Sequence, residues 1–201
     1  MKQSKRDLLA FDRSDRIGLL VTIWVAVGLA FVALAYQPVA RWVRGAAVEV
    51  PFTSRLTVPE LDRVGTTYGA AEYAVRIAHP RAVDYALTLL PGLLALALFV
   101  AGALVVQRIA RTIGSGDPFA AGQVRRLRLL AGLLLVGAPA YALVNLASTG
   151  ALLSRAELGG LDPALIFPFP LAAMAAGLVL ALLAEAFKTG TDLRDDVEGL
   201  V

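Results

Sequence analysis

Four long stretches without a charged residue most constrain how this chain of 201 residues can fold. They cover residues 17–36, 85–106, 129–153 and 164–184. Each supplies about the 20 apolar residues that an α-helix needs to cross a bilayer, and apolar side chains surround each predicted helix on all sides. With 58% hydrophobic and 17% charged residues, the composition is typical of a membrane protein. The sequence therefore predicts an all-α membrane protein with four transmembrane helices.

Basic residues between the four stretches predict how the chain is oriented. They are dense in the head (1–16) and in the loop 107–128, and almost absent from the loop 154–163. Because short cytoplasmic loops carry the excess of lysine and arginine, both termini are predicted to be cytoplasmic. The loops 37–84 and 154–163 are then extracytoplasmic. We expect the plasma membrane of a bacterial cell as the location.

The first stretch has an alternative interpretation as a cleaved signal peptide, because Ala33-Leu34-Ala35 resembles a cleavage site. A signal peptide has an apolar region of about 7–15 residues after a short basic start. Here the apolar run covers 17–36 and follows a head that also contains Asp7 and Asp12. We therefore expect a retained transmembrane helix.

The long outer loop contains two segments with the period of a β-strand. Residues 48–58 alternate apolar and polar, with Val48, Val50 and Phe52 on one face, and Pro51 favours an edge position. Residues 72–79 repeat the pattern less regularly. We expect a small antiparallel β element whose apolar face rests on the helix ends or on the bilayer. It either binds an extracytoplasmic ligand or serves as a structural cap.

Polar residues and prolines interrupt the third and fourth stretches. Pro139 in mid-span is expected to kink the third helix. A polar patch follows it on the outer half of the helix, made up of Tyr141, Asn145 and Thr149. The patch lines a small cavity on one interpretation and supplies hydrogen bonds between helices on the other. Pro168 and Pro170 are expected in the first turns of the fourth helix, where a missing N–H is tolerated.

Small residues recur at a spacing of four in the first and fourth stretches. They are Gly18, Thr22, Ala26 and Ala30 in the first, and Ala173, Gly177 and Ala181 in the fourth. Such stripes allow close approach of helices in a membrane. The alternative is chance in a chain rich in alanine.

No motif in the chain predicts a reaction. Gly114-Ser115-Gly116-Asp117 matches the GxGD string of intramembrane aspartyl proteases, but that chemistry needs a second aspartate and no predicted span contains one. Asp117 before Pro118 is instead typical of a helix start and predicts an interfacial helix at 118–128. A single histidine, no cysteine and no nucleotide-binding string predict no enzyme, metal or cofactor. A net charge of +3 without a basic stripe predicts no direct binding of nucleic acid.

Two cytoplasmic segments together predict a surface that contacts a partner. The fourth helix is expected to extend to residue 187, with Glu185 paired to Lys188, and an acidic tail follows at 188–201. Gly190 is expected to end the helix, and a short capped helix then carries an apolar face. The candidate partner surface consists of Gly116, Asp117, Pro118, Phe119, Arg125, Arg126, Arg128, Gly190, Leu193, Asp196 and Val197. A tail that lies on the membrane is the alternative, which its acidic face disfavours.

The order of these features resembles the DUF2975 family of bacterial four-helix membrane proteins, whose biochemistry is unassigned. The resemblance rests on the long loop after the first stretch, on the turn Gly116-Asp117-Pro118-Phe119 before a basic stretch, on the third and fourth stretches, and on the tail. Such proteins are often encoded beside a small helix-turn-helix regulator. The resemblance therefore implies a membrane partner that binds or restrains a transcription regulator.

The leading hypothesis is a non-enzymatic regulatory or sensory module in the membrane. A small transporter or transporter accessory subunit is the first alternative, supported by Pro139, Tyr141 and Asn145. A structural envelope protein is the second. The lipid bilayer is an expected partner in each case, and the sequence leaves the oligomeric state open.

Overall fold

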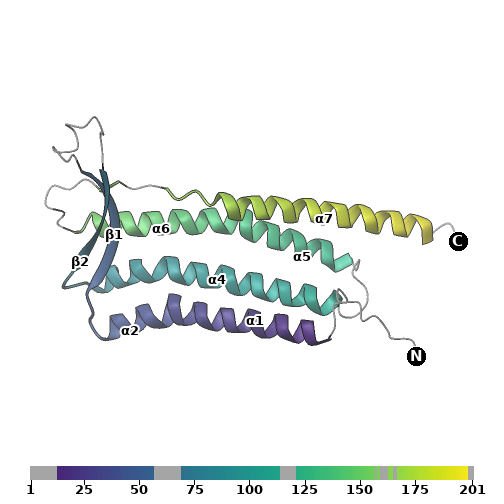
Figure 1. Cartoon of the computed structure of the whole chain (residues 1–201), viewed down its shortest axis with the longest axis horizontal. Coiled ribbons are helices and arrows are strands. Elements are labelled where there is room, and N and C mark those ends of the chain that lie inside the picture. Colours follow the sequence, from purple (N-terminus) through teal and green to yellow (C-terminus); the bar gives the residue numbers. More distant parts are fainter. Residues whose placement is uncertain are drawn as a thin grey trace, which may run out of the picture. The chain divides into compact units, whose positions relative to one another are not determined.

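The computed structural model describes residues 13–56, 69–113, 121–156, 158, 163–164 and 167–198. The helical elements are α1 (Arg13–Phe31), η1 (Val32–Tyr36), α2 (Gln37–Val43), α4 (Ala82–Ile113), α5 (Ala121–Gly132), η2 (Leu133–Gly137), α6 (Ala138–Leu153) and α7 (Leu171–Glu198). The strands are β1 (Val48–Leu56), β2 (Gly69–Ile77) and β3 (Pro163–Ala164). Figure 1 shows these elements with their labels.

Four of the helical segments are long and apolar enough to cross a membrane. They cover Ile17–Val43, Ala82–Thr112, Gly122–Leu153 and Leu171–Gly190. Large apolar side chains stay exposed along them, for example Leu29, Val136 and Leu182. Exposed apolar surface on this scale is unfavourable in water and suits contact with lipid. The prediction of four apolar helices of spanning length is confirmed.

The fourth helix begins later than predicted. It starts at Leu171 rather than at residue 164, so Pro168 and Pro170 precede the helix instead of lying in its first turns. A proline pushes the residue before it out of the helical region of backbone space, and two prolines in close succession therefore delay the start. Pro163–Ala164 forms the short strand β3 instead.

The fourth helix also ends later than predicted, because α7 continues through Gly190 to Glu198. A glycine ends a helix when it adopts a positive φ, and Gly45 is the positive-φ glycine among the described residues. Gly190 keeps a helical backbone, which costs only about 1 kcal/mol relative to alanine. The short separate tail helix predicted after Gly190 is therefore wrong.

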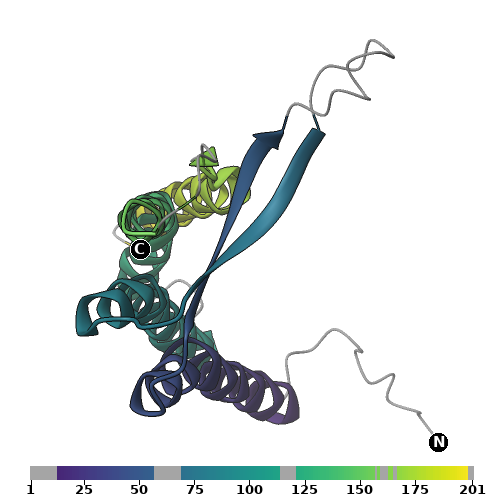
Figure 2. The same ribbon diagram turned by 90° about the vertical axis from the view of Figure 1, so that its left-hand side faces the viewer.

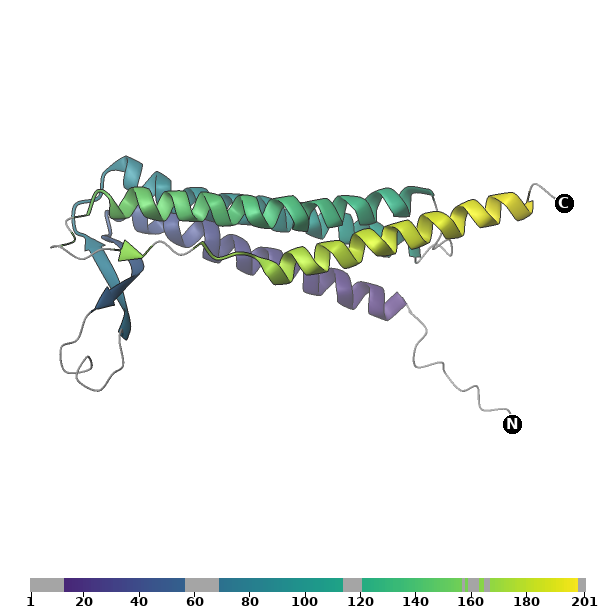
Figure 3. The same ribbon diagram turned by 90° about the horizontal axis from the view of Figure 1, so that it is seen from above.

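The third helix accommodates Pro139 through a π-helical turn. The turn η2 directly precedes the proline, and the helical backbone continues without a break through Gly122–Leu153 (Figure 3). Proline has no N–H to donate to the carbonyl four residues earlier, and a π-helical turn shifts the local hydrogen bonding. The sequence predicted a kink at Pro139, and the irregularity that the structure has beside it is this π-helical turn. The helix expected at 118–128 corresponds to α5, and the turn before Ala121 lies outside the described residues.

The chain divides into two compact units. In the described residues the first unit consists of 13–29, 97–113, 121–137 and 171–198, and the second of 30–56, 69–96, 138–156, 158, 163–164 and 167–170. Helix α4 contributes residues to both.

The second unit is built around a β-hairpin. Strands β1 and β2 pair antiparallel from Val48 opposite Ile77 to Leu56 opposite Gly69 (Figure 2). The sheet order is β2-β1-β3, but β3 pairs only with Thr53 and Ser54, so β1 is an edge strand at Pro51. The predicted antiparallel β element and its edge proline are confirmed, but the second strand is Gly69–Ile77 and not residues 72–79.

The apolar face of the hairpin packs on helix ends, as the sequence predicted. Val48, Val50 and Phe52 are buried on this face, whereas Glu49 and Pro51 between them are exposed. They form one core cluster with Tyr85 at the start of α4 and with Leu152 and Leu153 at the end of α6. The strand alternation therefore determines which side of the hairpin meets the helices.

In the first unit, helix α7 packs against α5 and η2 through small residues. A Cβ at Gly177 would lie 2.9 Å from Cγ of Leu135 and 3.2 Å from the carbonyl oxygen of Ala131. Ala131 and Ala184 are almost completely buried. The contact stripe predicted for the fourth helix is thus borne out at Gly177. At Gly18 of the first stripe, a Cβ would meet none of the described atoms within 4 Å.

Candidate functional site

A cavity of about 360 Å³ lies beneath the hairpin in the second unit. Side chains from β1, from the first turns of α4 and from the end of α6 line it. Its polar lining residues are Glu49, Thr53, Thr88, Asn145, Ser148 and Thr149, and apolar ones include Phe52, Leu87, Leu146 and Leu153. A volume of this size is within the range of small-molecule sites, which are concave, mostly apolar and carry a few directed polar groups.

Helix α6 supplies three polar side chains to this cavity. Asn145, Ser148 and Thr149 follow one another at the spacing that places residues on one helix face. None of the three side chains has a hydrogen-bond partner among the described residues, although Ser148 is only 4% exposed. Buried polar groups are nearly always hydrogen-bonded. The amide and the hydroxyls are therefore available to water or to a ligand in the cavity.

The predicted polar patch is only partly brought together. Asn145 and Thr149 line the cavity, whereas Tyr141 is 37% exposed and does not. Tyr141 lies one helical turn further from the hairpin than Asn145, which takes its ring past the end of the cavity. Of the two interpretations of the patch, the lining of a cavity fits Asn145 and Thr149 better than hydrogen bonding between helices. Neither side chain forms a hydrogen bond with another helix of the described residues.

The strand contributes the charged group that sequence reasoning missed. Glu49 is the charged residue among the described lining of this cavity, and it also lines a smaller cavity of about 120 Å³ together with Arg41 and Gln37. Glu49 and Thr53 are polar residues of the alternating pattern in β1, and this pattern was the sequence signal that could have indicated them. Because Glu49 lies on the exposed face of β1, its carboxylate can meet a neutral or positively charged polar ligand at the open side of the cavity.

Buried contacts at the start of α4 hold the walls of the cavity in place. Asp84 accepts a hydrogen bond from the backbone N–H of Arg81 at 2.8 Å, which caps the helix, and pairs with Nη1 of Arg155 at 3.0 Å. Tyr85 donates its hydroxyl to the carbonyl oxygen of Ala46 at 2.7 Å, and its ring stacks on Trp42. These contacts join the end of the first span, the hairpin and both helices of the cavity.

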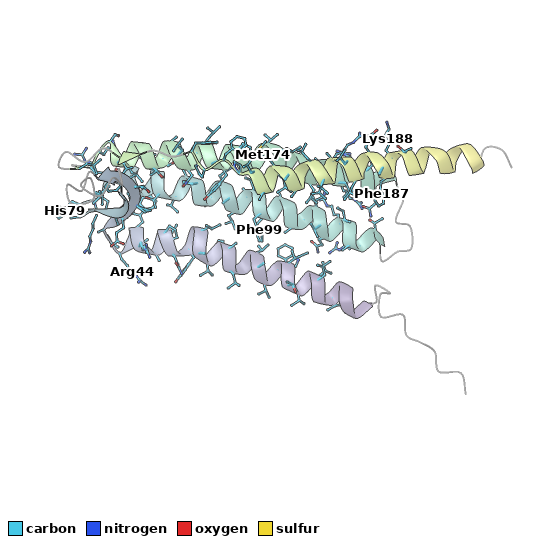
Figure 4. All side chains as sticks on the ribbon, turned by 45° about the horizontal axis from the view of Figure 1, so that its top comes forward. Arg44, His79, Phe99, Met174, Phe187 and Lys188 are labelled. Carbon is cyan, nitrogen blue, oxygen red and sulfur yellow. The ribbon has the colours of Figure 1, made fainter. Side chains whose placement is uncertain are left out.

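Among the described residues, no three acidic, histidine or cysteine side chains lie close enough together to hold a metal ion. The single histidine, His79, follows β2 and is exposed (Figure 4). Among the described residues that line the cavity, Glu49 is the one with a carboxylate.

The predicted cytoplasmic surface is divided among different structural roles. Arg128 of α5 pairs with Glu185 of α7 at 2.7 Å. Lys188 lies 3.6 Å from the same carboxylate, which is the pair that the sequence predicted. Arg126 bonds the end of α4, and Arg125 is exposed. Gly190 lies within α7.

The other residues of the predicted cytoplasmic surface, or their side chains, belong to parts of the chain that the structure does not describe. Gly116, Asp117, Pro118 and Phe119 lie outside the described residues, and so do the side chains of Leu193, Asp196 and Val197.

A comparison with protein-family models finds a match that extends over residues 41–201 and therefore covers the hairpin, the cavity beneath it and helices α4, α5, α6 and α7. The chain belongs to the DUF2975 family. The family is described as a protein of unknown function, so membership of DUF2975 confirms the resemblance without assigning an activity. No curated protein and no solved structure matches the chain.

Proposed function

We propose that this DUF2975 protein is a non-enzymatic regulatory or sensory module of the bacterial plasma membrane. Both termini are cytoplasmic in this proposal, and the hairpin is extracytoplasmic. The cavity beneath the hairpin takes a small polar ligand from outside the cell. The cytoplasmic end binds a partner such as a helix-turn-helix transcription regulator.

The cavity carries this proposal. Asn145, Ser148 and Thr149 have unused hydrogen-bonding groups inside a pocket large enough for a ligand, and Glu49 adds one negative charge. These groups face a pocket that water can enter, so they are free to exchange water for the polar groups of a ligand, and a purely structural cap does not need them.

The tail supports the cytoplasmic part of the proposal. Helix α7 continues eight residues beyond the end of its apolar segment at Gly190, and this extension is rich in aspartate and glutamate. A DNA-binding regulator has a basic face for phosphates, and an acidic helix is complementary to such a face. The tail is therefore suited to compete with DNA for a regulator.

Transcript profiling of cells tests the regulatory role. We compare a strain without the gene, a strain with Ser148→Leu, which fills the cavity, and a strain with Tyr141→Leu, which changes an exposed residue of the same helix. Deletion should change transcript levels, Ser148→Leu should shift the same transcripts, and Tyr141→Leu should leave them as in the wild type. Deletion without any transcriptional effect would rule the regulatory role out and favour a structural protein.

A pull-down from detergent tests the role of the tail. The full-length protein should retain a cytoplasmic partner that is lost when residues 190–201 are removed. If every partner remains bound to the truncated protein, the tail has no docking role.

A transporter is a second candidate, favoured by the π-helical turn η2 and Pro139 within the third span. Single π-helical turns inside α-helices often occur at functional sites. On this alternative Asn145→Leu should abolish flux into liposomes, and unchanged flux would count against it.

A further inference from the structure

Three arginines line another pocket, in the first unit, where α4 stops and α5 begins. The pocket has a volume of about 410 Å³ and is lined by Arg108 of α4 and by Gly122, Arg125, Arg126 and Leu129 of α5. Neither the cavity beneath the hairpin nor the tail includes these residues.

Arg126 is fixed within this cluster. Its Nη1 donates to the carbonyl oxygen of Arg108 at 3.2 Å, to Oε1 of Gln123 at 3.3 Å and to Oγ1 of Thr112. Gln123 is itself buried and lies 3.5 Å from the carbonyl oxygen of Ile109. Uncharged oxygens therefore hold this guanidinium in place at the C-terminal turn of α4, and no described carboxylate neutralises it.

The other two arginines make no contact that explains their position. The side chains of Arg108 and Arg125 are exposed and have neither a hydrogen bond nor an ion pair with a described residue. Arg128 and Arg155, by contrast, each pair with a carboxylate. All three residues line one pocket, where the guanidinium of Arg126 lies beside Gly122, and the side-chain stems supply most of the wall. Like charges on neighbouring arginines repel one another, and an anion bound at the rim of the pocket relieves that repulsion.

We propose that this pocket binds a phosphate group. Guanidinium groups bind phosphate oxygens through paired, charge-assisted hydrogen bonds. Arg108 lies near the end of the apolar segment Ala82–Thr112, and Arg125 lies in the first turn of Gly122–Leu153, which is the depth at which a spanning helix meets the lipid headgroups. The phosphodiester of an anionic phospholipid and free phosphate share the required chemistry, and Leu129 adds an apolar wall.

Binding of phosphatidylglycerol to the purified full-length protein in detergent, followed by native mass spectrometry, tests this proposal. Arg125→Gln and Arg108→Gln remove one pocket charge each without breaking a described contact. Arg111→Gln is the matched control, because Arg111 is exposed in the last turn of α4 and does not line the pocket. Each pocket variant should weaken binding about tenfold or more, and the control should bind as the wild type does.

Two further measurements complete the test. Gly122→Leu fills the pocket and keeps every charge, so it should weaken phosphatidylglycerol binding as the arginine variants do. Addition of inorganic phosphate identifies the source: if it displaces the lipid, the site takes free phosphate, and if it does not, the site is specific for the lipid headgroup. Equal losses in Arg111→Gln and Arg125→Gln, or wild-type affinity in both pocket variants, would overturn the proposal. The lipid-binding measurements do not depend on the proposed cytoplasmic partner or on the proposed ligand of the cavity beneath the hairpin.

Discussion

Replacement of Gly92 by alanine should destabilise the packing of the first two spans. Gly92 lies in α4, and a Cβ at this position would be 2.7 Å from the carbonyl oxygen of Leu34 in η1 and 3.5 Å from its carbonyl carbon. A carbon–oxygen contact normally measures about 3.3 Å or more. The atoms in the way belong to the backbone, so a change of side-chain rotamer cannot relieve the clash and the two helices must separate locally.

The expected size of the effect follows from the comparison with a second glycine of the same helix. Gly102 has none of the described atoms within 4 Å of its built Cβ, so Gly102→Ala should gain up to about 1 kcal/mol from helix propensity. Gly92→Ala gains the same amount but loses about 1–3 kcal/mol through overpacking. The difference between the two variants isolates the packing cost. For a chain of this size it corresponds to a difference in Tm of roughly 2–12 °C.

Thermal unfolding in detergent, followed by tryptophan fluorescence, measures this difference. Trp42 stacks on Tyr85 with ring centroids 5.7 Å apart, so its emission reports on the unit that contains Gly92. Gly92→Ala should unfold at a lower temperature than the wild type, and Gly102→Ala at the same or a higher temperature. If Gly92→Ala is as stable as Gly102→Ala, the close approach of Leu34 and Gly92 is wrong.

The same unfolding assay tests three polar contacts. Asp84→Ala should lower the free energy of unfolding by about 1–3 kcal/mol, because it removes both the ion pair with Arg155 and the cap of α4. A variant as stable as the wild type would contradict both roles. Tyr85→Phe should cost about 1 kcal/mol through the lost hydrogen bond to Ala46, and a variant as stable as the wild type would argue against that bond. Glu185→Gln should leave Tm nearly unchanged at any salt concentration, because both partners of its ion pair are more than half exposed; a large loss would show that the pair is buried in the membrane.

The features that the sequence predicted well depend on local periodicity. Alternation between residues 48 and 58 placed Val48, Val50 and Phe52 on the buried face of a strand, and the structure confirms this. The lengths of the apolar stretches predicted the four helices in the same way. In both cases one short window of sequence contains the whole signal, since burial on one face imposes the period.

The features that the sequence did not predict depend on contacts between distant segments or on competing local rules. Asp84 and Arg155 are 71 residues apart, and no pattern in either segment indicates the partner. Prolines are tolerated in the first turn of a helix, but Pro168 and Pro170 together delay α7, because each also restricts the residue before it. The sequence indicated the polar face of α6 at Asn145 and Thr149. It did not indicate that β1 and α4 form the other walls of the cavity around these residues.

Cysteine labelling in intact cells tests most directly the central claim that the chain crosses the bilayer with its hairpin outside and both termini inside. The natural sequence contains no cysteine, so single substitutions can be labelled one at a time with a membrane-impermeant maleimide. Arg76→Cys in β2 and Arg111→Cys at the end of α4 both replace exposed side chains. Arg76→Cys should be labelled in intact cells, and Arg111→Cys only after the membrane is permeabilised. Labelling of both positions from the same side, or of Arg111→Cys alone from outside, would contradict the account.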